Sequence, residues 1–466
     1  MRHLPISARR WGPTTWGGLL IACLLLCGAG APSVAAMPID DAGIPSLGEG
    51  IAVRVAPAAP AAACVARVAG STTDYTTVQA AVDAAATYGT VLVAGVCTGV
   101  SDVGGTVQTV KIAKHLTIEG GYDSSDWAAG LDPVAHPTTL DAGGAGRVVY
   151  VDYPAVVTLR GLRIQGGYQI DTWGEGNGGG IYNTGTLTVD RCTVRNSSAR
   201  YGAGIYNDRH LTVVRSLIEG NTAVTSAGGA GGGIFSRDQG WESSLSISNS
   251  TLANNTVKVS GGAISSQAPT GMLESSTLVG NTSQWAAEGE GGIDIFGNGA
   301  LTVKGTILAD NSPRNCGTSD TAVVVDGGHN LDDDSTCAFT SAGTLHTDPL
   351  LGPLEDNGGP TLTFEPTSAS LVINAGDPAY VAPSGDTDQR GLPRVISGRI
   401  DIGAVEIQTP CRAKVGDTEY ASRDASAVQQ AIDAAAVDGT VKIGGACTGV
   451  STVDGTVQAV RIAKDL

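Results

Sequence analysis

The chain is poor in aromatic and charged residues. Aromatic residues make up 5% of the 466 positions and include only 4 phenylalanines, and charged residues make up 16%. Few large rings are available for a core, so small and aliphatic side chains must fill the interior, and the 66 glycines agree with this. The length fits about two or three ordinary domains or one elongated array.

Basic residues are also scarce. Lys and Arg number 28 against 45 Asp and Glu, which gives a formal net charge of −17 at pH 7. Such a surface repels nucleic acid and anionic lipid, so we expect no nucleic-acid partner. A polyanionic substrate such as pectate would require a local basic cleft or a bridging cation.

The chain has no zinc-type CxxC pair. Of its 9 cysteines, Cys23 and Cys27 lie in the apolar N-terminal segment. The others suggest disulfide pairs in an oxidising compartment, with free buried thiols as the alternative. The candidate pairs are Cys64 with Cys97, Cys316 with Cys337, and Cys411 with Cys447. Cys192 is left over, and we interpret it as a core thiol rather than a nucleophile.

The N-terminus has the pattern of an export signal. Basic Arg2, Arg9 and Arg10 precede an apolar run at 17–31 and the small residues 33–35. The run is shorter than the roughly 20 residues of a membrane span. Residues 1–36 are therefore predicted to be a signal peptide, with residues 20–23 leaving a lipoprotein signal as the alternative. Pro/Ala-rich residues 37–63 follow as a linker, and we expect a secreted or cell-surface protein without a transmembrane span.

One short phrase recurs five times along the chain. It reads GGGIYN at 178–183, GAGIYN at 202–207, GGGIFS at 231–236, GGAISS at 261–266 and GGIDIF at 291–296. Its isoleucines are 24, 29, 30 and 29 residues apart, and two further short strand-like segments follow each copy. A period of 20–30 residues with short strands is typical of a β-solenoid coil. The glycines then occupy corners that require a positive φ.

Each repeat also ends in an asparagine followed by Ser or Thr. The positions are Asn196, Asn221, Asn255, Asn281 and Asn311. Stacked coils would place these amides above one another, so we predict an internal asparagine ladder. Asn196 and Asn281, together with Asn249 and Asn254, also match the N-glycosylation pattern, which is the alternative interpretation.

An amphipathic segment at 74–90 precedes the repeats and predicts a helix. Together with the glycine-rich short strands and the Asn-ended segments, this helix resembles the pectin-lyase type of β-helix. The resemblance implies an all-β fold, a right-handed parallel β-helix (β-solenoid) over 64–328, whose short N-terminal helix caps the open end of the coil. The pairing of GGAI at 261–264 with the Asn-ended segments also resembles the polymorphic outer-membrane proteins of chlamydiae, which implies an adhesin-like role at the cell surface.

Residues 329–408 resemble the choice-of-anchor end region of exported β-helix proteins. The motifs are HNLDDDSTC, TDPLLGPLEDNGGPT, INAGDP, TDQRGLPR and DIGAVE. Residues 409–466 repeat the beginning of the β-helix, since 447–466 matches 97–116 at 15 of 20 positions. We interpret this last segment as the truncated start of a second β-helix unit.

Few residues suggest catalysis, and we predict no catalytic residue. Asp332, Asp333 and Asp334 are the densest acidic cluster and a candidate Ca²⁺ site, with a solvated loop as the alternative. Three consecutive residues in an extended strand should not all face one ion. The lyase-like run from Arg390 to Arg394 lies inside the end-region motif, where a structural role is the simpler explanation. No cofactor other than Ca²⁺ is expected.

Aromatic residues in the turns could line a sugar-binding face or stack as a ladder. They are Tyr168, Trp173, Tyr182, Tyr201, Tyr206, Trp241 and Trp285. We predict a structural, adhesive or binding role, with an extended polysaccharide or a host or cell-surface protein as partner. The alternative is a polysaccharide lyase or glycoside hydrolase. Carboxylates that converge with an Arg or Lys in a groove on one face would favour the enzyme.

Overall fold

The computed structural model describes residues 62–170, 176–223, 228–240, 243–285, 289–396, 399–408, 411–422, 425–444, 451–453, 456–458 and 460–462. The predicted signal peptide and linker up to residue 61 lie outside these ranges, as does Cys447. Within them, no helix is long and apolar enough to cross a membrane.

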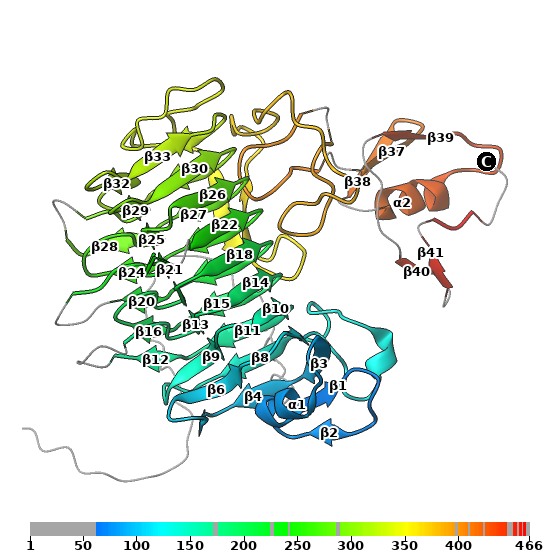
Figure 1. The fold of residues 1–466 in the computed structure, drawn as a ribbon. Helices are drawn as coiled ribbons and strands as arrows, with labels where there is room; N and C mark the ends of the chain where they lie inside the picture. The colour runs from blue at the N-terminus through cyan, green and yellow to red at the C-terminus, as the bar shows by residue number, and fades with distance from the viewer. Residues whose placement is uncertain are drawn as a thin grey trace, which may run out of the picture. The chain divides into compact units, whose positions relative to one another are not determined.

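The described residues up to β34 (Leu331–Asp332) form a right-handed parallel β-helix, whose stacked coils are visible in Figure 1. Face 1 is an 11-stranded sheet in the order β2 (Asp74–Tyr75), β1 (Val65–Val68), β3 (Gly89–Ala94), β7 (Leu116–Glu119), β10 (Val156–Arg160), β14 (Thr186–Asp190), β18 (His210–Val214), β22 (Ser244–Ser248), β26 (Thr270–Glu274), β30 (Ala300–Lys304) and β33 (Val323–Asp326). From β3 onward its neighbouring strands are parallel.

Two nine-stranded sheets and one short sheet complete the coils. Face 2 contains β34 (Leu331–Asp332), β31 (Ile307–Ala309), β27 (Thr277–Val279), β23 (Thr251–Ala253), β19 (Leu217–Glu219), β15 (Thr193–Arg195), β11 (Leu162–Gln165), β8 (Thr138–Asp141) and β4 (Val96–Thr98). Face 3 contains β32 (Cys316–Thr318), β29 (Ile293–Ile295), β25 (Ile264–Ser266), β21 (Ile234–Ser236), β17 (Ile205–Asn207), β13 (Ile181–Asn183), β9 (Arg147–Val151), β6 (Val107–Ile112) and β5 (Ser101–Asp102). The corner sheet contains β12 (Tyr168–Gln169), β16 (Ser198–Ala199), β20 (Thr222–Ala223), β24 (Thr256–Val257) and β28 (Thr282–Ser283).

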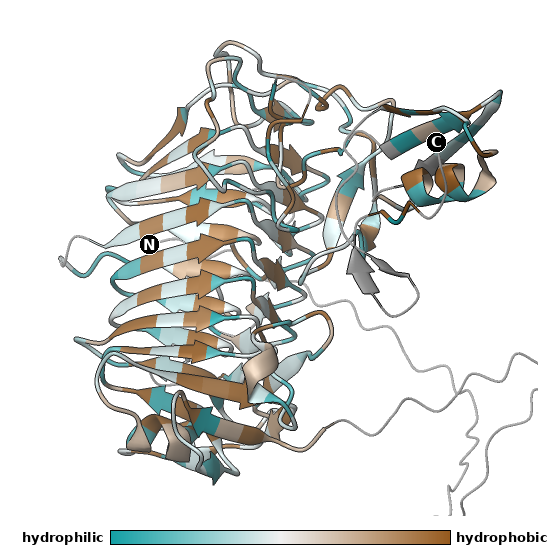
Figure 2. Cartoon of the chain, turned by 90° about the vertical axis from the view of Figure 1, so that its right-hand side faces the viewer, coloured by the Kyte–Doolittle hydropathy of each residue, from teal (hydrophilic) through white to brown (hydrophobic). Residues whose placement is uncertain are grey.

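The recurring phrase forms the corner and first strand of each coil, as predicted. Ile181 is in register with Ile205, and Ile205 with Ile234, and all three are fully buried. Figure 2 shows columns of hydrophobic residues that run from coil to coil across the stacked strands. Gly178 has a φ of +63°, and a Cβ there would overlap the backbone of Ile181. Only glycine fits this corner.

Four of the five predicted asparagines form the internal ladder. The Asn221 amide donates to Asn255 Oδ1 at 3.0 Å, and the same bond joins Asn255 to Asn281 (2.9 Å) and Asn281 to Asn311 (2.8 Å). These side chains are buried. Each rung therefore joins one coil to the next in the interior.

The prediction was wrong for Asn196, which is exposed at a corner with a φ of 50°. Ser197 occupies the ladder position instead, and its backbone N–H donates to Asn221 Oδ1 at 3.1 Å. The corner position takes residues that tolerate left-handed backbone, as Gly220 and Asn254 show in later coils. Because Asn is suited to both of these adjacent positions, the sequence pattern placed the ladder one residue too early in this coil.

A second internal ladder, of hydroxyl groups, was not predicted. The backbone N–H of Cys192 donates to Ser216 Oγ at 3.1 Å, that of Ser216 to Ser250 Oγ at 3.1 Å, and that of Ser250 to Ser276 Oγ at 3.3 Å. Cys192 begins this ladder and is fully buried. The serines recur at equivalent positions of the repeat, so the sequence could have predicted this ladder.

Burial raises the pKa of the Cys192 thiol to about 12. We expect this thiol to resist iodoacetamide in the folded protein and to react only after unfolding, because the thiolate is the nucleophile. Mass spectrometry of the peptide containing Cys192, with and without denaturant, measures this. Cys192→Ser should change the free energy of unfolding by less than about 1 kcal/mol, since Ser occupies the later rungs. Rapid labelling of the folded protein would contradict the core assignment.

The N-terminal cap helix α1 (Val78–Ala84) is shorter than the predicted 74–90, because β2 and β3 take up the ends of that range. The Thr77 side chain caps it by accepting from the Ala80 N–H. The Gln79 side chain exchanges two hydrogen bonds with the Lys111 backbone, at 3.2 and 2.7 Å. The 3-10 helix η1 (Trp127–Ala129) lies in the loop after β7.

The C-terminal segment repeats this cap. It contains β37 (Cys411–Val415), β38 (Thr418–Ser422), α2 (Ser426–Ala434), β39 (Val441–Gly444), β40 (Ser451–Val453) and β41 (Thr456–Gln458). Gln429 exchanges two hydrogen bonds with the Arg461 backbone, at 3.1 and 2.7 Å. The same contact therefore recurs at the same spacing in both copies.

The predicted end region folds back along the outer side of face 2. It contains the antiparallel pair β35 (Leu351–Glu355) and β36 (Thr363–Pro366). Thr251 Oγ1 donates to Gln389 Oε1 at 2.7 Å, and the Ala404 N–H donates to Thr277 Oγ1 at 3.0 Å. Val372 and Ile402 pack there with outward-facing apolar residues of β27 and β31. This segment covers the side of the last coils.

Candidate functional site

Face 3 carries a row of aromatic side chains that ends abruptly. In register along the coils, the outward positions are Tyr150, Tyr182, Tyr206, Phe235, Ser265, Asp294 and Gly317. The centroids of consecutive rings are 5.1, 5.3 and 5.3 Å apart. After Phe235 the residues are small or acidic, so the row of rings gives way to a hollow.

The hollow is a groove of about 800 Å³. Its walls include the rings of Tyr201, Tyr206, Phe235, Trp285 and Phe296. Its polar lining includes Arg237, Glu290, Asp294 and Arg314, together with several hydroxyl groups. Its residues come from strands β17, β21, β25, β29 and β32 of face 3 and from turns beside these strands, in the green part of the stack in Figure 1.

Glu290 lies at the corner that precedes β29, and its side chain is 9% exposed. Its Oε1 is 2.9 Å from Arg314 Nη2. A Cβ at Gly317 would overlap this carboxyl group, so the absence of a side chain there makes room for it. Burial, followed by the charge of Asp294, raises the pKa of Glu290 to about 7. The carboxyl group is therefore partly protonated at neutral pH.

Asp294 projects outward from β29 into the groove. Its Oδ2 accepts hydrogen bonds from Ser260 Oγ at 2.7 Å and from Ser265 Oγ at 2.9 Å. Burial raises its pKa, and the two hydroxyl bonds oppose this rise. Among the described residues, no cation lies within ion-pair distance of Asp294, and its Oδ1 has no hydrogen-bond partner.

The predicted acidic cluster lies elsewhere, at the end of the asparagine ladder. Asn311 donates to Asn315 Oδ1, and the Asn315 amide nitrogen is 2.7, 2.7 and 3.1 Å from oxygens of Asp332, Asp333 and Asp334. These carboxylates lie within 4.8 Å of one another, so the expectation that three consecutive acids cannot converge was wrong. The chain leaves strand β34 at Asp332 and turns, which brings them together.

The cluster thus has a structural partner in Asn315. Burial raises the pKa of Asp332 to about 6, and its bonds with Asn315 and Cys337 oppose the rise. The candidate Ca²⁺ site stays a prediction.

The lyase-like arginines are buried inside the end region. Arg390 Nε donates to Asp388 Oδ2 at 2.9 Å, and Arg394 Nη2 donates to the Gly403 carbonyl at 2.9 Å. Their exposed fractions are 6% and 1%. Neither lines the groove, and both bind residues of the same end-region motifs.

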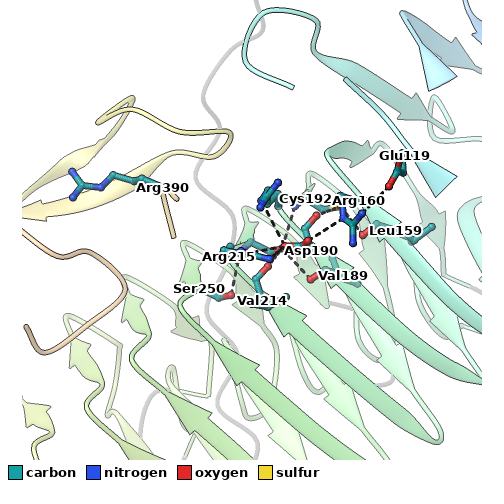
Figure 3. Close-up of polar contacts among 12 residues, drawn as sticks. Glu119, Leu159, Arg160, Val189, Asp190, Cys192, Val214, Arg215, Ser250 and Arg390 are labelled. Carbon is teal, nitrogen blue, oxygen red and sulfur yellow. Dashed lines mark hydrogen bonds and ion pairs between the residues drawn. The ribbon is translucent and has the colours of Figure 1, made fainter. Parts of the chain in front are cut away.

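A third charged cluster joins coils on the outer side of face 1. Figure 3 shows Asp190 between Arg160 and Arg215, at 3.1 and 2.8 Å, while Arg160 also binds Glu119 at 2.7 Å. Its acids and bases neutralise one another across neighbouring strands of one sheet. We interpret it as an ion-pair network that stabilises the stack.

Two predicted disulfides are present, Cys64–Cys97 and Cys316–Cys337. The third predicted pair includes Cys447, which lies outside the described residues. Of the aromatic residues singled out in the sequence, Tyr201, Tyr206 and Trp285 line the groove. Trp173 and Trp241 also lie outside the described ranges.

Glu290, Asp294, Arg237 and Arg314 were not predicted as site residues. The available signal was a break in the repeat. The residue after the recurring isoleucine changes from Tyr or Phe in the earlier copies to Ser265 and then to Asp294. Glu290 is a further break, because it lies three residues before Ile293, where the earlier copies have a glycine such as Gly261. Arg314 belongs to a segment without the phrase. Their approach depends on how neighbouring coils are stacked.

The family described as "Right handed beta helix region" matches residues 175–339. The protein has a right-handed parallel β-helix fold. Among solved structures, "Crystal structure of pectate lyase Pel9A" is similar over 70% of this chain and 90% of that chain, with 16% sequence identity and a TM-score of 0.29. No curated protein matches the chain.

The groove offers three kinds of interaction. Aromatic rings provide apolar faces, carboxyl oxygens accept hydrogen bonds, and hydroxyl groups of Ser260 and Ser265 hold one carboxylate in position. Such a mixture of aromatic walls and a few convergent polar groups is typical of a ligand-binding site.

Proposed function

We propose that this chain is an exported β-helix protein that binds an extended glycan in the groove on face 3. The observation that carries the proposal is that one cavity of about 800 Å³ contains aromatic rings, two carboxyl groups and two arginines. The predicted signal peptide supports export, and disulfides are typical of oxidising compartments. The sequence analysis also predicts a host or cell-surface protein as an alternative binding partner.

The exposure of the rings supports a glycan. Trp285 is 49% exposed, so a face of its indole is available to a ligand. Phe235 is 8% exposed and serves as part of the wall. Coils repeat about every 4.8 Å, so a groove that crosses several coils accommodates a polymer rather than a single small molecule.

Replacing Trp285 by alanine should weaken glycan binding about tenfold or more, because exposed aromatic anchors dominate binding at such sites. Isothermal titration calorimetry with neutral, acidic and amino-bearing oligosaccharides measures this. Tyr168→Ala is the matched control, since Tyr168 is 50% exposed on β12 and does not line the groove. Equal losses in both variants, or no binding of any oligosaccharide to the unaltered protein, would contradict the proposal.

Hydrolysis of the bound glycan is the second candidate function. It is favoured by the pKa of about 7 at Glu290, which suits a general acid, beside a second carboxyl group. Glu290 would protonate the glycosidic oxygen as the bond to the anomeric carbon breaks. Asp294 would take a proton from the water that adds to that carbon. A lyase would require a free basic residue, whereas Arg314 is paired with Glu290.

A further inference from the structure

A second cavity lies between the outer side of face 2 and a turn of the end region. It has a volume of about 180 Å³. Face 2 contributes Arg163 from β11, Thr193 and Arg195 from β15, and Glu219 from β19. The turn 356–362, between β35 and β36, also lines it. None of these residues lines the groove on face 3.

The side chain of Arg163 makes no hydrogen bond or ion pair with another described residue. Burial lowers the pKa of its guanidinium group, the charge of Arg195 lowers this pKa further, and no acid opposes the two effects. The positive charge of Arg163 is therefore unopposed. An anion beside it would relieve the cost of that charge.

Thr193 adds a hydroxyl group next to Arg163. The two residues are in register on neighbouring strands, and both line this cavity and a smaller one that adjoins it. Thr193 is 8% exposed. Its hydroxyl group has no hydrogen-bond partner among the described residues, although buried polar groups usually have one. This hydroxyl group is therefore available to a ligand.

The two acidic residues of the cavity do not neutralise Arg163. Glu219 Oε1 is 3.7 Å from Arg195 Nη1, so its charge is paired with that arginine. Asp356 is exposed, and its Oδ1 accepts the Gly358 N–H at 3.0 Å. Neither carboxyl group contributes to the pKa of Arg163.

A third arginine, Arg191, lines the adjoining cavity, whose lining contains no acid. Arg191 Nε is 4.0 Å from Asp190 Oδ1. Arg215 and Arg160 bind the same carboxylate at 2.8 and 3.1 Å, so Arg191 shares it with two closer cations. The two cavities together are therefore lined by three arginines and two carboxyl groups.

We infer that this cavity binds a small oxyanion, namely a phosphate, sulfate or carboxylate group, held by the Arg163 guanidinium and the Thr193 hydroxyl group. The guanidinium presents parallel N–H donors that match the oxygen atoms of such groups. The hydroxyl group donates to a further oxygen. The inference goes beyond the proposed glycan-binding function, because the cavity shares no residue with the groove. A free ion and an anionic group on a larger molecule share this chemistry.

Calorimetry on the full chain measures the binding of inorganic phosphate, inorganic sulfate, acetate and glucose 6-phosphate at constant ionic strength, because salt screens exposed charges. Inorganic phosphate should bind with a Kd of about 1 mM or lower. Arg163→Gln should weaken this binding about tenfold or more, because it removes a charge-assisted hydrogen bond. Thr193→Val should weaken it about threefold or more, because valine has a similar shape and no hydroxyl group.

Arg412→Gln is the control and should leave the affinity unchanged, because Arg412 is exposed on β37 and lines neither cavity. Thermal melting verifies the fold of each variant. Equal affinity for inorganic phosphate and glucose 6-phosphate would support a site for an anionic group on a larger molecule. A preference of about tenfold for inorganic phosphate would support a site for a free ion.

Three results would overturn the inference. Absence of binding by all four anions would refute the site itself. Arg163→Gln and Thr193→Val proteins that bind phosphate as tightly as the unaltered protein would place the ion elsewhere. An equal loss of affinity in the Arg412→Gln protein would indicate attraction by the overall charge rather than binding in this cavity.

Discussion

Replacing Glu290 by glutamine should lower the rate of glycosidic bond cleavage by about 10²–10⁴-fold, the usual contribution of a general acid. Glutamine has nearly the same size and can keep a hydrogen bond with Arg314, but it has no proton of suitable acidity. In the unaltered protein, cleavage should fall as the pH rises through about 7, because Glu290 then loses its proton. Release of reducing ends from the tightest-binding oligosaccharide, measured across pH, provides the test.

Calorimetry provides the control for this substitution. Glu290→Gln should leave the affinity for the oligosaccharide within about threefold, because a general acid acts mainly in the transition state. A protein that binds the oligosaccharide without releasing reducing ends has the binding function alone. A Glu290→Gln protein that cleaves at the original rate would exclude Glu290 as the acid.

Replacing Arg390 by alanine should lower the free energy of unfolding by about 3–5 kcal/mol, because it leaves a buried carboxylate without its cation. Asp388 is fully buried, and its Oδ2 is 2.9 Å from Arg390 Nη2. The same carboxylate accepts the Leu392 and Glu406 N–H groups, so it organises the turn that packs on face 2. Urea unfolding monitored by circular dichroism measures the loss.

Two controls sharpen this prediction. Arg412→Ala removes an exposed ion pair, with side-chain exposures of 60% and 47%, and should cost less than about 1 kcal/mol. The double variant Arg390→Met with Asp388→Asn should be less destabilised than Arg390→Ala, because it leaves no unpaired charge. An Arg390→Ala protein as stable as the Arg412→Ala protein would contradict the structural role of this motif.

The coil architecture was predictable because it depends on a repeated local pattern. Parallel stacking places residues one period apart in register, so a column of isoleucines in the sequence becomes a column in the core, as Ile181 and Ile205 show. The same regularity led to the asparagine ladder. The same regularity gave a wrong ladder residue at Asn196, because the corner position and the ladder position beside it both accept Asn.

The groove was not predictable because its charged residues occupy positions where the copies of the repeat differ, and they meet across neighbouring coils. Ser260 precedes the strand of one coil, Asp294 lies on the next strand, and Arg314 follows in the coil after that. Their distances depend on the path of the turns between the strands. The raised pKa of Glu290 depends on burial, which has no signature in a single sequence.

The sequence by itself determined the coil: the spacing of its strands, the glycines at its corners, the columns of aliphatic side chains and the cap that begins it. Each of these follows from residues that are close in the chain or one period apart. Only the tertiary structure decided which face carries the groove and which face the end region covers. Thr251 and Gln389 are 138 residues apart, and their contact arises from side-by-side packing of surfaces that share no repeat.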